Sequence, residues 1–227
     1  MYQQIQEEID RYTQKIRNYQ AEGKRIFASS SFQTHSIPML RILSEIDQSI
    51  PIYFLDTGFH FPETLMYKKQ IGELYGLDVR HLTSPIAKKQ QINAKGEFSF
   101  VSDPDHCCYM NKVLPMEVVL PQYDVWISGV RKDQSKVRAN FQEEEQGKHD
   151  TLRYHPMLDW DKKMIWRYIY DNDIPHHPLD AKGYESIGCE PCTAVRFRLN
   201  EGRNGRWEGM DKKECGLHID LVENTTK

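Results

Sequence analysis

The sequence lacks several features that would at once assign it to a common class of protein. It has no apolar run of about 18 residues, the length that a membrane-spanning helix requires. Its polar, acidic start differs from a signal peptide, which joins a basic start to an apolar core. A basic excess is also missing, because the net charge is −3. We therefore expect a cytoplasmic protein that binds neither a membrane nor nucleic acid.

Two common nucleotide-binding motifs are absent as well. The sequence contains neither the phosphate loop G-x-x-x-x-G-K-[ST] nor the dinucleotide motif G-x-G-x-x-G. Their absence disfavours a kinase-like enzyme and a conventional dinucleotide-binding enzyme. Any anion that the protein binds must be held by local clusters of another kind.

The hydrophobic pattern alternates between helix and strand along the first three quarters of the chain. With 227 residues, of which 39% are hydrophobic, the chain fits one core-forming domain. The pattern predicts strands at residues 25–28, 51–55, 77–82 and 125–128, and helices at residues 3–20, 36–46, 62–75, 107–119 and 159–172. Strands that alternate with helices imply an α/β fold with a mostly parallel twisted sheet flanked by helices. We place a domain boundary after residue 200, with a C-terminal tail over 201–227.

Polar residues follow two of the predicted strands, where an open parallel sheet binds its ligands. Ser29, Ser30 and Ser31 precede a helix, and backbone N–H groups and hydroxyls there can bind phosphate or sulfate. A cluster of N-cap serines is the alternative interpretation. Asp56 follows the most apolar strand, where its carboxylate can meet ribose or adenine edges. Helix capping or turn formation explains Asp56 nearly as well.

A cationic loop follows the predicted strand at 125–128. Arg131 and Lys132 belong to a segment with four cations and one acid, which suits a polyanionic ligand. A solvated charged loop is the usual alternative. The position directly after a buried strand favours the ligand site.

The five cysteines form two pairs and a single residue. Cys107 and Cys108 are adjacent, Cys189 and Cys192 form a C-x-x-C turn, and Cys215 stands alone. In a reducing cytoplasm, metal or catalytic roles are favoured over disulfides. Adjacent cysteines bind one tetrahedral ion only with strain, whereas they can reach two corners of an iron–sulfur cubane. The two pairs therefore favour a [4Fe–4S] cluster, with zinc, a redox dithiol or buried small hydrophobes as alternatives.

Two further residues complete this group. Lys112 lies four residues after Cys108, on the same face of the predicted helix, where its ammonium could stabilise an anionic cluster and a bound anion. Cys215 is the spare thiol, and its neighbours Lys212, Lys213 and His218 favour the reactive thiolate while Glu214 opposes it. An exposed lysine and an unpaired surface cysteine are the alternatives.

Taken together, these motifs resemble the sulfonucleotide reductases, the assimilatory reductases of adenylylsulfate (APS) and phosphoadenylylsulfate (PAPS). The resemblance is carried by the segments Arg131–Ser135, Gly188–Cys192 and Glu214–His218. Members with both cysteine pairs usually act on APS, and some accept both nucleotides. The resemblance therefore implies an APS reductase, and it leaves a PAPS or dual reductase as the alternative.

The resemblance also implies a fold, a cofactor and a mechanism. The fold would be adenine-nucleotide α-hydrolase-like, with a mobile C-terminal catalytic tail. Cys215 would attack the sulfur of APS, release AMP and carry an S-sulfonate, from which a thioredoxin or glutaredoxin thiol releases sulfite. A [4Fe–4S] cluster on the two cysteine pairs would organise charge beside the sulfate. This activity serves sulfate assimilation and cysteine biosynthesis.

The family pattern assigns roles to individual residues. It places Ser29–Ser31 in the nucleotide loop, Arg131 and Lys132 in the phosphosulfate loop, Arg203 and Arg206 in a segment that closes over the substrate, Lys112 between cluster and substrate, and His218 in the tail. Phe32–His35 depart from the family pattern, which leaves the contacts after Ser31 open. A nucleotide-binding protein with a structural zinc site is the alternative of a different class. The reductant and the oligomeric state, a homo-oligomer included, are also left open.

Overall fold

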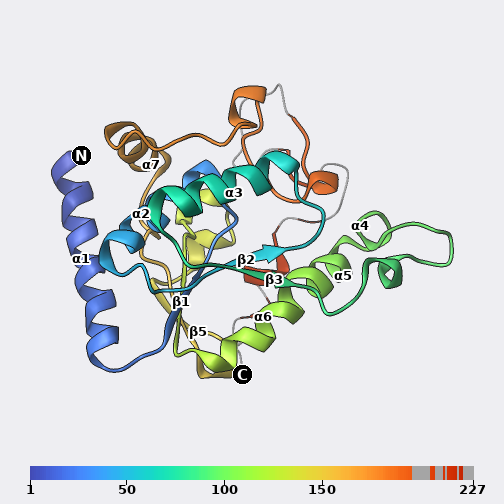
Figure 1. The fold of residues 1–227 in the computed structure, drawn as a ribbon, viewed down its shortest axis with the longest axis horizontal. Helices are drawn as coiled ribbons and strands as arrows, with labels where there is room; N and C mark the ends of the chain where they lie inside the picture. Colours follow the sequence, from blue (N-terminus) through green and yellow to red (C-terminus); the bar gives the residue numbers. More distant parts are fainter. Residues whose placement is uncertain (196–204, 208–211, 213, 219, 222–227) are drawn as a thin grey trace.

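The computed structural model describes residues 1–195, 205–207, 212, 214–218, 220 and 221, and a six-stranded sheet forms their centre (Figure 1). The strands are β1 (Ile26–Ser29), β2 (Ile52–Asp56), β3 (Val79–Thr83), β4 (Val125–Ser128), β5 (Glu144–Gln146) and β6 (Leu152–Tyr154). Their order is β3-β2-β1-β4-β6-β5, and only β5 pairs antiparallel within this described sheet. The predicted mostly parallel sheet is confirmed, whereas β5 and β6 were not predicted.

Seven α-helices are described around this sheet. They are α1 (Tyr2–Ala21), α2 (Ile37–Ile46), α3 (Pro62–Tyr75), α4 (Ser99–Ser102), α5 (Pro104–Cys108), α6 (Leu114–Val119) and α7 (Lys162–Asp171). In Figure 1, α2 and α3 lie on one side of β2 and β3, and α5 and α6 lie on the other. Among the described helices, none combines the length and hydropathy of a membrane span.

Strand side chains alternate between two cores. Ala28 and Ile127 pack with the apolar faces of α1, α2, α3 and α7. Phe27 and Trp126 point to the opposite face, where they join the α6 segment and the buried cysteines of the C-terminal part. The twofold period of a strand explains this division, and it places the thiols on one face of the sheet.

The predicted helix at 107–119 is not one continuous α-helix. A π-helical turn over Tyr109–Val113 separates α5 from α6. Such turns insert an extra residue and shift the side chains that follow relative to those that precede. The turn includes Asn111 and Lys112, so it determines where the predicted catalytic lysine points.

The strand order reverses between β1 and β4. From β1 the chain proceeds outward to β2 and β3, and from β4 it proceeds to the other edge, where β5 lies and from which β6 returns to pair with β4. A reversal of this kind opens a crevice beyond the carboxyl ends of the two central strands. Segments after β6, including Gly188–Cys192 and Cys215, cover this crevice. The predicted boundary after residue 200 lies outside the described residues.

Candidate active site

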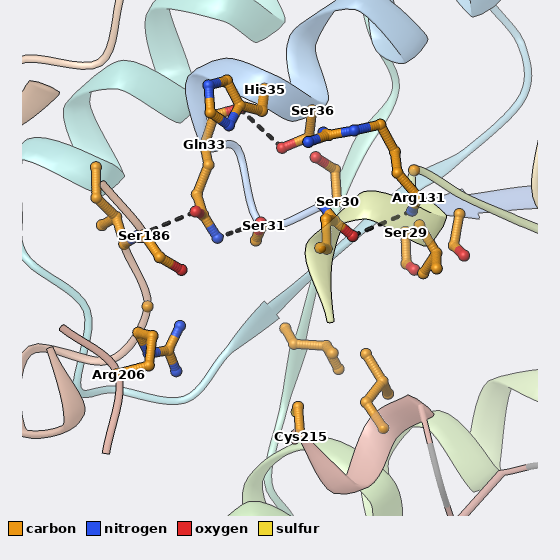
Figure 2. A pocket seen from close by; sticks show the side chains of 18 of the residues that line it. Ser29, Ser30, Ser31, Gln33, His35, Ser36, Arg131, Ser186, Arg206 and Cys215 are labelled. Carbon is orange, nitrogen blue, oxygen red and sulfur yellow. Dashed lines mark hydrogen bonds between the residues drawn. The ribbon is translucent and has the colours of Figure 1, made fainter. Parts of the chain in front are cut away.

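A cavity of about 250 Å³ lies beyond the carboxyl ends of β1 and β4. Figure 2 shows the serine loop and Arg131 on one side of this cavity and Cys215 on the other. Eight of the predicted site residues line it: Ser29, Ser30, Ser31, Lys112, Arg131, Cys189, Arg206 and Cys215. Residues from six separate parts of the chain therefore meet where the topology opens the crevice.

The serine loop is shaped by hydrogen bonds and by an unusual backbone angle. Phe32 has a φ of 51°, a left-handed conformation that is uncommon for a bulky residue, and its N–H donates to Ser30 Oγ at 3.0 Å. Gln33 Nε2 donates to Ser31 Oγ at 3.2 Å, while Gln33 Oε1 accepts from the N–H of Ile187 at 3.0 Å (Figure 2). Gln33 thus joins the serine loop to the segment that precedes Cys189.

Arg131 carries the positive charge of the cavity floor. The residue is 4% exposed, and its Nε pairs with Asp133 at 3.0 Å. Among the described residues, the buried Nη1 atom has no hydrogen-bond partner. Burial of an unsatisfied cationic donor costs free energy, which binding of an anion would recover.

Three other predicted binding residues are placed differently. Lys132 is half exposed, pairs with Asp159 at 2.7 Å and is not among the residues lining the cavity. Asp56 accepts from the Gly58 N–H at 3.1 Å, lies 3.2 Å from His81, and also lies outside the cavity lining. Arg203 falls outside the described residues.

Cys215 is buried beside a cation. The residue is 7% exposed, and Lys112 Nζ lies 3.8 Å from Cys215 Sγ. Burial alone would lower the pKa of Lys112, but the sulfur atoms of Cys215, Cys189 and Cys108 outweigh burial and raise this pKa. Lys112 is therefore an ammonium, and its charge favours the thiolate of Cys215. The side chain of His218 lies outside the described part of the structure.

Glu214 does not act on Cys215 as an uncompensated negative charge. Its buried carboxylate accepts from Arg138 Nε at 3.1 Å and from Arg138 Nη2 at 3.0 Å. Ser135 Oγ adds a third hydrogen bond at 3.0 Å, and the Cys215 N–H donates to Glu214 Oε1 at 2.9 Å. The cationic loop therefore fixes the residue next to the thiol.

The four paired cysteines line a second, smaller cavity next to the first. Cys107, Cys108, Cys189 and Cys192 all contribute to this cavity and are all buried. Burial raises the pKa of Cys107 to about 11, with Cys189 and Cys192 adding to the effect. Lys88 lies close enough to be influenced by Cys107 and Cys189.

This thiol group fits an iron–sulfur cluster by its number of donors, their chemistry and their common cavity. In the described residues, however, no three His, Cys, Asp or Glu side chains are grouped as a metal site. Cys108 is hydrogen-bonded to Cys215, and this bond together with burial raises the pKa of Cys108. The four thiols are thus brought to one place without converging on one centre.

Arg206 connects the two cavities. Its guanidinium lines both of them, as do Lys112 and Cys189. Arg206 Nε donates to the Cys192 carbonyl at 3.3 Å, and the guanidinium stacks over Trp207 at 4.6 Å. An anion in the first cavity and the four cysteines of the second would therefore lie next to the same two cations, Lys112 and Arg206.

Several lining residues escaped the sequence interpretation. Gln33, Ser128, Arg138 and Ser186 line the cavity, as does His35. Burial and the charges of Arg131 and Lys162 lower the pKa of His35 to about 4. Of these residues, only Ser128 and Arg138 could have been predicted from the sequence, because they are the first and last residues of the predicted cationic loop.

The fold and the cavity define an α/β protein with a cavity lined by cationic side chains at a topological switch point and a thiol in its wall. The phosphoadenosine phosphosulfate reductase domain family matches residues 25–195, and the chain belongs to this family. The adenosine 5'-phosphosulfate reductase of Lysinibacillus sphaericus is 37% identical over 204 residues, with 88% of this chain and 87% of the relative covered. The phosphoadenosine 5'-phosphosulfate reductase of Gloeobacter violaceus is 36% identical, with 86% and 83% covered.

A solved structure supports the same fold. The PAPS reductase from Candida auris, in a phosphate complex, superimposes with a TM-score of 0.66 at 20% identity, covering 78% of this chain and 87% of that chain. The α/β fold expected from the family resemblance is therefore confirmed.

Proposed function

We propose that this chain reduces APS to sulfite and AMP through an S-sulfonate on Cys215, with a thioredoxin-type dithiol as reductant. Reduction of a sulfonucleotide, and hence an oxidoreductase acting on sulfur, is supported by family membership and by the names of the relatives. The single observation that carries the mechanism is the placement of Cys215 Sγ, 3.8 Å from the Lys112 ammonium and in the wall of the anion cavity.

In the first step the Cys215 thiolate attacks the sulfur atom of the phosphosulfate. A new S–S bond forms, the bond from sulfur to the bridging oxygen breaks, and AMP leaves with that oxygen and its electron pair. Arg131, Arg206 and Lys112 are positioned to neutralise the charge that develops on the phosphate and sulfonate oxygens. We keep Lys132, Asp56 and Arg203 as predicted contacts of a substrate-bound arrangement.

In the second step a thiolate of the external dithiol attacks Cys215 Sγ. The S–S bond to the sulfonate breaks, sulfite leaves with the electron pair, and a mixed disulfide forms. The second thiol of the reductant then resolves this disulfide and returns Cys215 as a thiolate. Cys215 is buried in the described state, so its thiol must become exposed to the reductant for this exchange. We keep His218 as a predicted catalytic residue near Cys215.

Cys107, Cys108, Cys189 and Cys192 would hold a [4Fe–4S] cluster, which would supply a charged group beside the sulfate. The support for this assignment is that four buried thiols line one cavity, which shares Lys112, Cys189 and Arg206 with the anion site. A location in the cytoplasm is consistent with five cysteines that form no disulfide.

The intact mass of the protein after mixing with APS in the absence of reductant tests the proposal. We expect a gain of one SO₃ group, lost after a dithiol is added, and absent in Cys215→Ser. An unmodified wild-type mass would contradict the S-sulfonate. The second candidate function is reduction of PAPS, or of both nucleotides, and it is favoured by a relative at 36% identity that is named as a PAPS reductase. Sulfite release from APS and from PAPS, measured side by side, decides between the two functions.

A further inference from the structure

Two serines lie side by side on the cavity floor. Ser29 ends β1 and Ser128 ends β4, and the two residues are direct partners in the parallel register. Both line the cavity and both are nearly buried. They share the face of the sheet that carries Phe27 and Trp126, so their hydroxyls are presented to the same ligand.

Ser29 has a hydroxyl proton that is free to donate. Trp126 Nε1 lies 2.8 Å from Ser29 Oγ, and an indole nitrogen can only donate. Ser29 Oγ is therefore the acceptor in this bond. Its own O–H remains available for an acceptor atom of the ligand.

The hydroxyl of Ser128 contacts a buried histidine, and its donor and acceptor roles are the reverse of those of Ser29. His155 Nδ1 lies 2.8 Å from Ser128 Oγ, and His155 Nε2 lies 3.6 Å from Glu145 Oε2. Burial lowers the pKa of His155, so the ring is neutral and carries one proton. That proton belongs on Nε2, because the other tautomer would point a lone pair at the Glu145 carboxylate.

Other charges around His155 agree with this tautomer. Arg153 Nη1 lies 3.5 Å from the same Glu145 oxygen, and the Arg153 guanidinium stacks over Trp126 and Phe141. Burial raises the pKa of Glu145, but His155, the Gln142 N–H and Arg153 together outweigh it and lower this pKa, so the carboxylate is ionised. With Nε2 protonated, Nδ1 accepts, and the Ser128 O–H must donate to it.

We infer that His155 is a positioning residue that turns Ser128 into a pure acceptor, so that Ser128 binds a hydrogen-bond donor of the nucleoside rather than the phosphosulfate. This inference rests on the proposed function. Phosphate and sulfate oxygens only accept, so they would face lone pairs at Ser128. A ribose hydroxyl or the adenine amine supplies the required donor, while Ser29 beside it donates to the same ligand.

The test uses the full chain and AMP, the nucleotide product of the proposed reaction. Isothermal titration of wild type and Ser128→Ala is done with AMP, with deoxy analogues that lack one ribose hydroxyl, with inosine monophosphate, which lacks the amine, and with inorganic sulfate. We expect Ser128→Ala to weaken AMP binding about fivefold, as loss of one neutral hydrogen bond does. Sulfate binding should stay unchanged, and one analogue should bind wild type and Ser128→Ala equally.

His155 variants separate positioning from packing. His155→Phe keeps the ring that stacks on Phe141 and removes the acceptor, so it should reproduce the loss of AMP affinity without adding to Ser128→Ala. His155→Asn supplies a carbonyl acceptor near the position of Nδ1 and should restore AMP affinity to within about twofold.

Three results would overturn the inference: AMP affinity unchanged in Ser128→Ala, weaker sulfate binding in that variant, or equal losses for every analogue. If wild type binds no AMP at all, the proposed function fails first, and the inference falls with it. If His155→Phe does not fold, the Ser128→Ala comparison across the ligands still decides the matter.

Discussion

Glu214 and Arg138 form a buried two-point ion pair, with Arg138 Nε 3.1 Å from Glu214 Oε2 and Arg138 Nη2 3.0 Å from Glu214 Oε1. The pair joins the cationic loop after β4 to the residue directly before Cys215. The local sequence suggests that Glu214 opposes the thiolate, but Arg138 neutralises its charge. The ion pair between Arg138 and Glu214 thus has two effects: it neutralises the charge next to the thiolate, and it fixes Cys215 beside Lys112.

Loss of this pair should release Cys215 from the cavity. In Arg138→Met the buried Glu214 carboxylate loses the Arg138 guanidinium, and breaking a buried pair costs about 3–5 kcal/mol. We expect APS reduction to fall at least about 100-fold, a loss of roughly 2.7 kcal/mol at about 1.4 kcal/mol per factor of ten. Alkylation of Cys215 by iodoacetamide should become faster, because the thiol gains access to solvent.

Lys132→Met is the matched control for this prediction. It removes a cation from the same loop, but Lys132 forms a half-exposed pair with Asp159 and does not touch Glu214. Cys215 alkylation should keep its wild-type rate in Lys132→Met. Slow alkylation in both variants would mean that the Arg138–Glu214 pair does not hold Cys215 in place.

The fold was largely predictable because its central strands are apolar and its helices amphipathic. The two central strands, Ile26–Ser29 and Val125–Ser128, bury nearly continuous apolar runs. β5 and β6 escaped prediction because each has three residues and β5 reads Glu-Glu-Gln. Such an edge strand pairs through its backbone and has no apolar pattern to reveal it.

The candidate site was predictable in its residue types but not in its contacts. Cysteine spacing indicates two pairs and a spare, whereas the hydrogen bond between Cys108 and Cys215 depends on tertiary structure that joins residues far apart in the sequence. The π-helical turn at Tyr109–Val113 and the left-handed Phe32 leave no mark in a hydrophobic pattern. Arg138 and Glu214 lie 76 residues apart, so nothing local announces their pairing.

A methyl group at Gly188 should displace Arg206 from the cavity. A Cβ atom there would overlap the Arg206 guanidinium, the flexible end of a side chain that can move away. We expect Gly188→Ala to raise the Kd for APS about tenfold while thermal stability stays close to wild type. Gly96→Ala, at an exposed left-handed glycine outside the cavity, should leave the Kd unchanged. A wild-type Kd in Gly188→Ala would show that Arg206 does not contact the ligand.

Buried histidines should make the fold sensitive to mild acid. Burial lowers the pKa of His60 to about 4 and that of His177 to about 4, from an ordinary value of 6.5. The unfolded chain therefore binds protons between these values while the folded chain does not. Stability is complete above pH 6.5 and is lost as the pH falls toward 4, by up to about 1.4 kcal/mol per pH unit for each histidine.

Thermal unfolding between pH 7.5 and pH 5, under reducing conditions, measures this loss. His177→Gln should flatten the dependence of Tm on pH, whereas the exposed His149→Asn should not. An equally steep profile in His177→Gln would assign the acid sensitivity to other groups.

A variant of the paired cysteines and a variant of Cys215 should differ in their metal content. Cys192→Ala removes one of the four thiols of the second cavity, so the purified variant should lose its iron and its visible absorption together with APS reduction. Cys215→Ser keeps all four thiols and should retain iron while losing turnover. Elemental analysis with a visible spectrum is the measurement, and a wild-type protein carrying zinc without iron would contradict the cluster.

Lys112 should control the pH dependence of Cys215 reactivity. Its ammonium lies 3.8 Å from Cys215 Sγ, and the raised pKa of Lys112 keeps it charged across the usable pH range. In Lys112→Met the thiolate loses this neighbour, so the midpoint of the pH profile for Cys215 alkylation should move upward. A shift of one unit corresponds to about 1.4 kcal/mol and lowers the thiolate fraction at neutral pH about tenfold. Lys112→Arg keeps the charge and should leave the midpoint near its wild-type value, although its larger fork fits the π-helical turn less well. If both variants gave the wild-type profile, the thiolate would owe its reactivity to a different cation, and Lys212, which also influences Cys215 from its ion pair with Asp105, would be the next residue to replace.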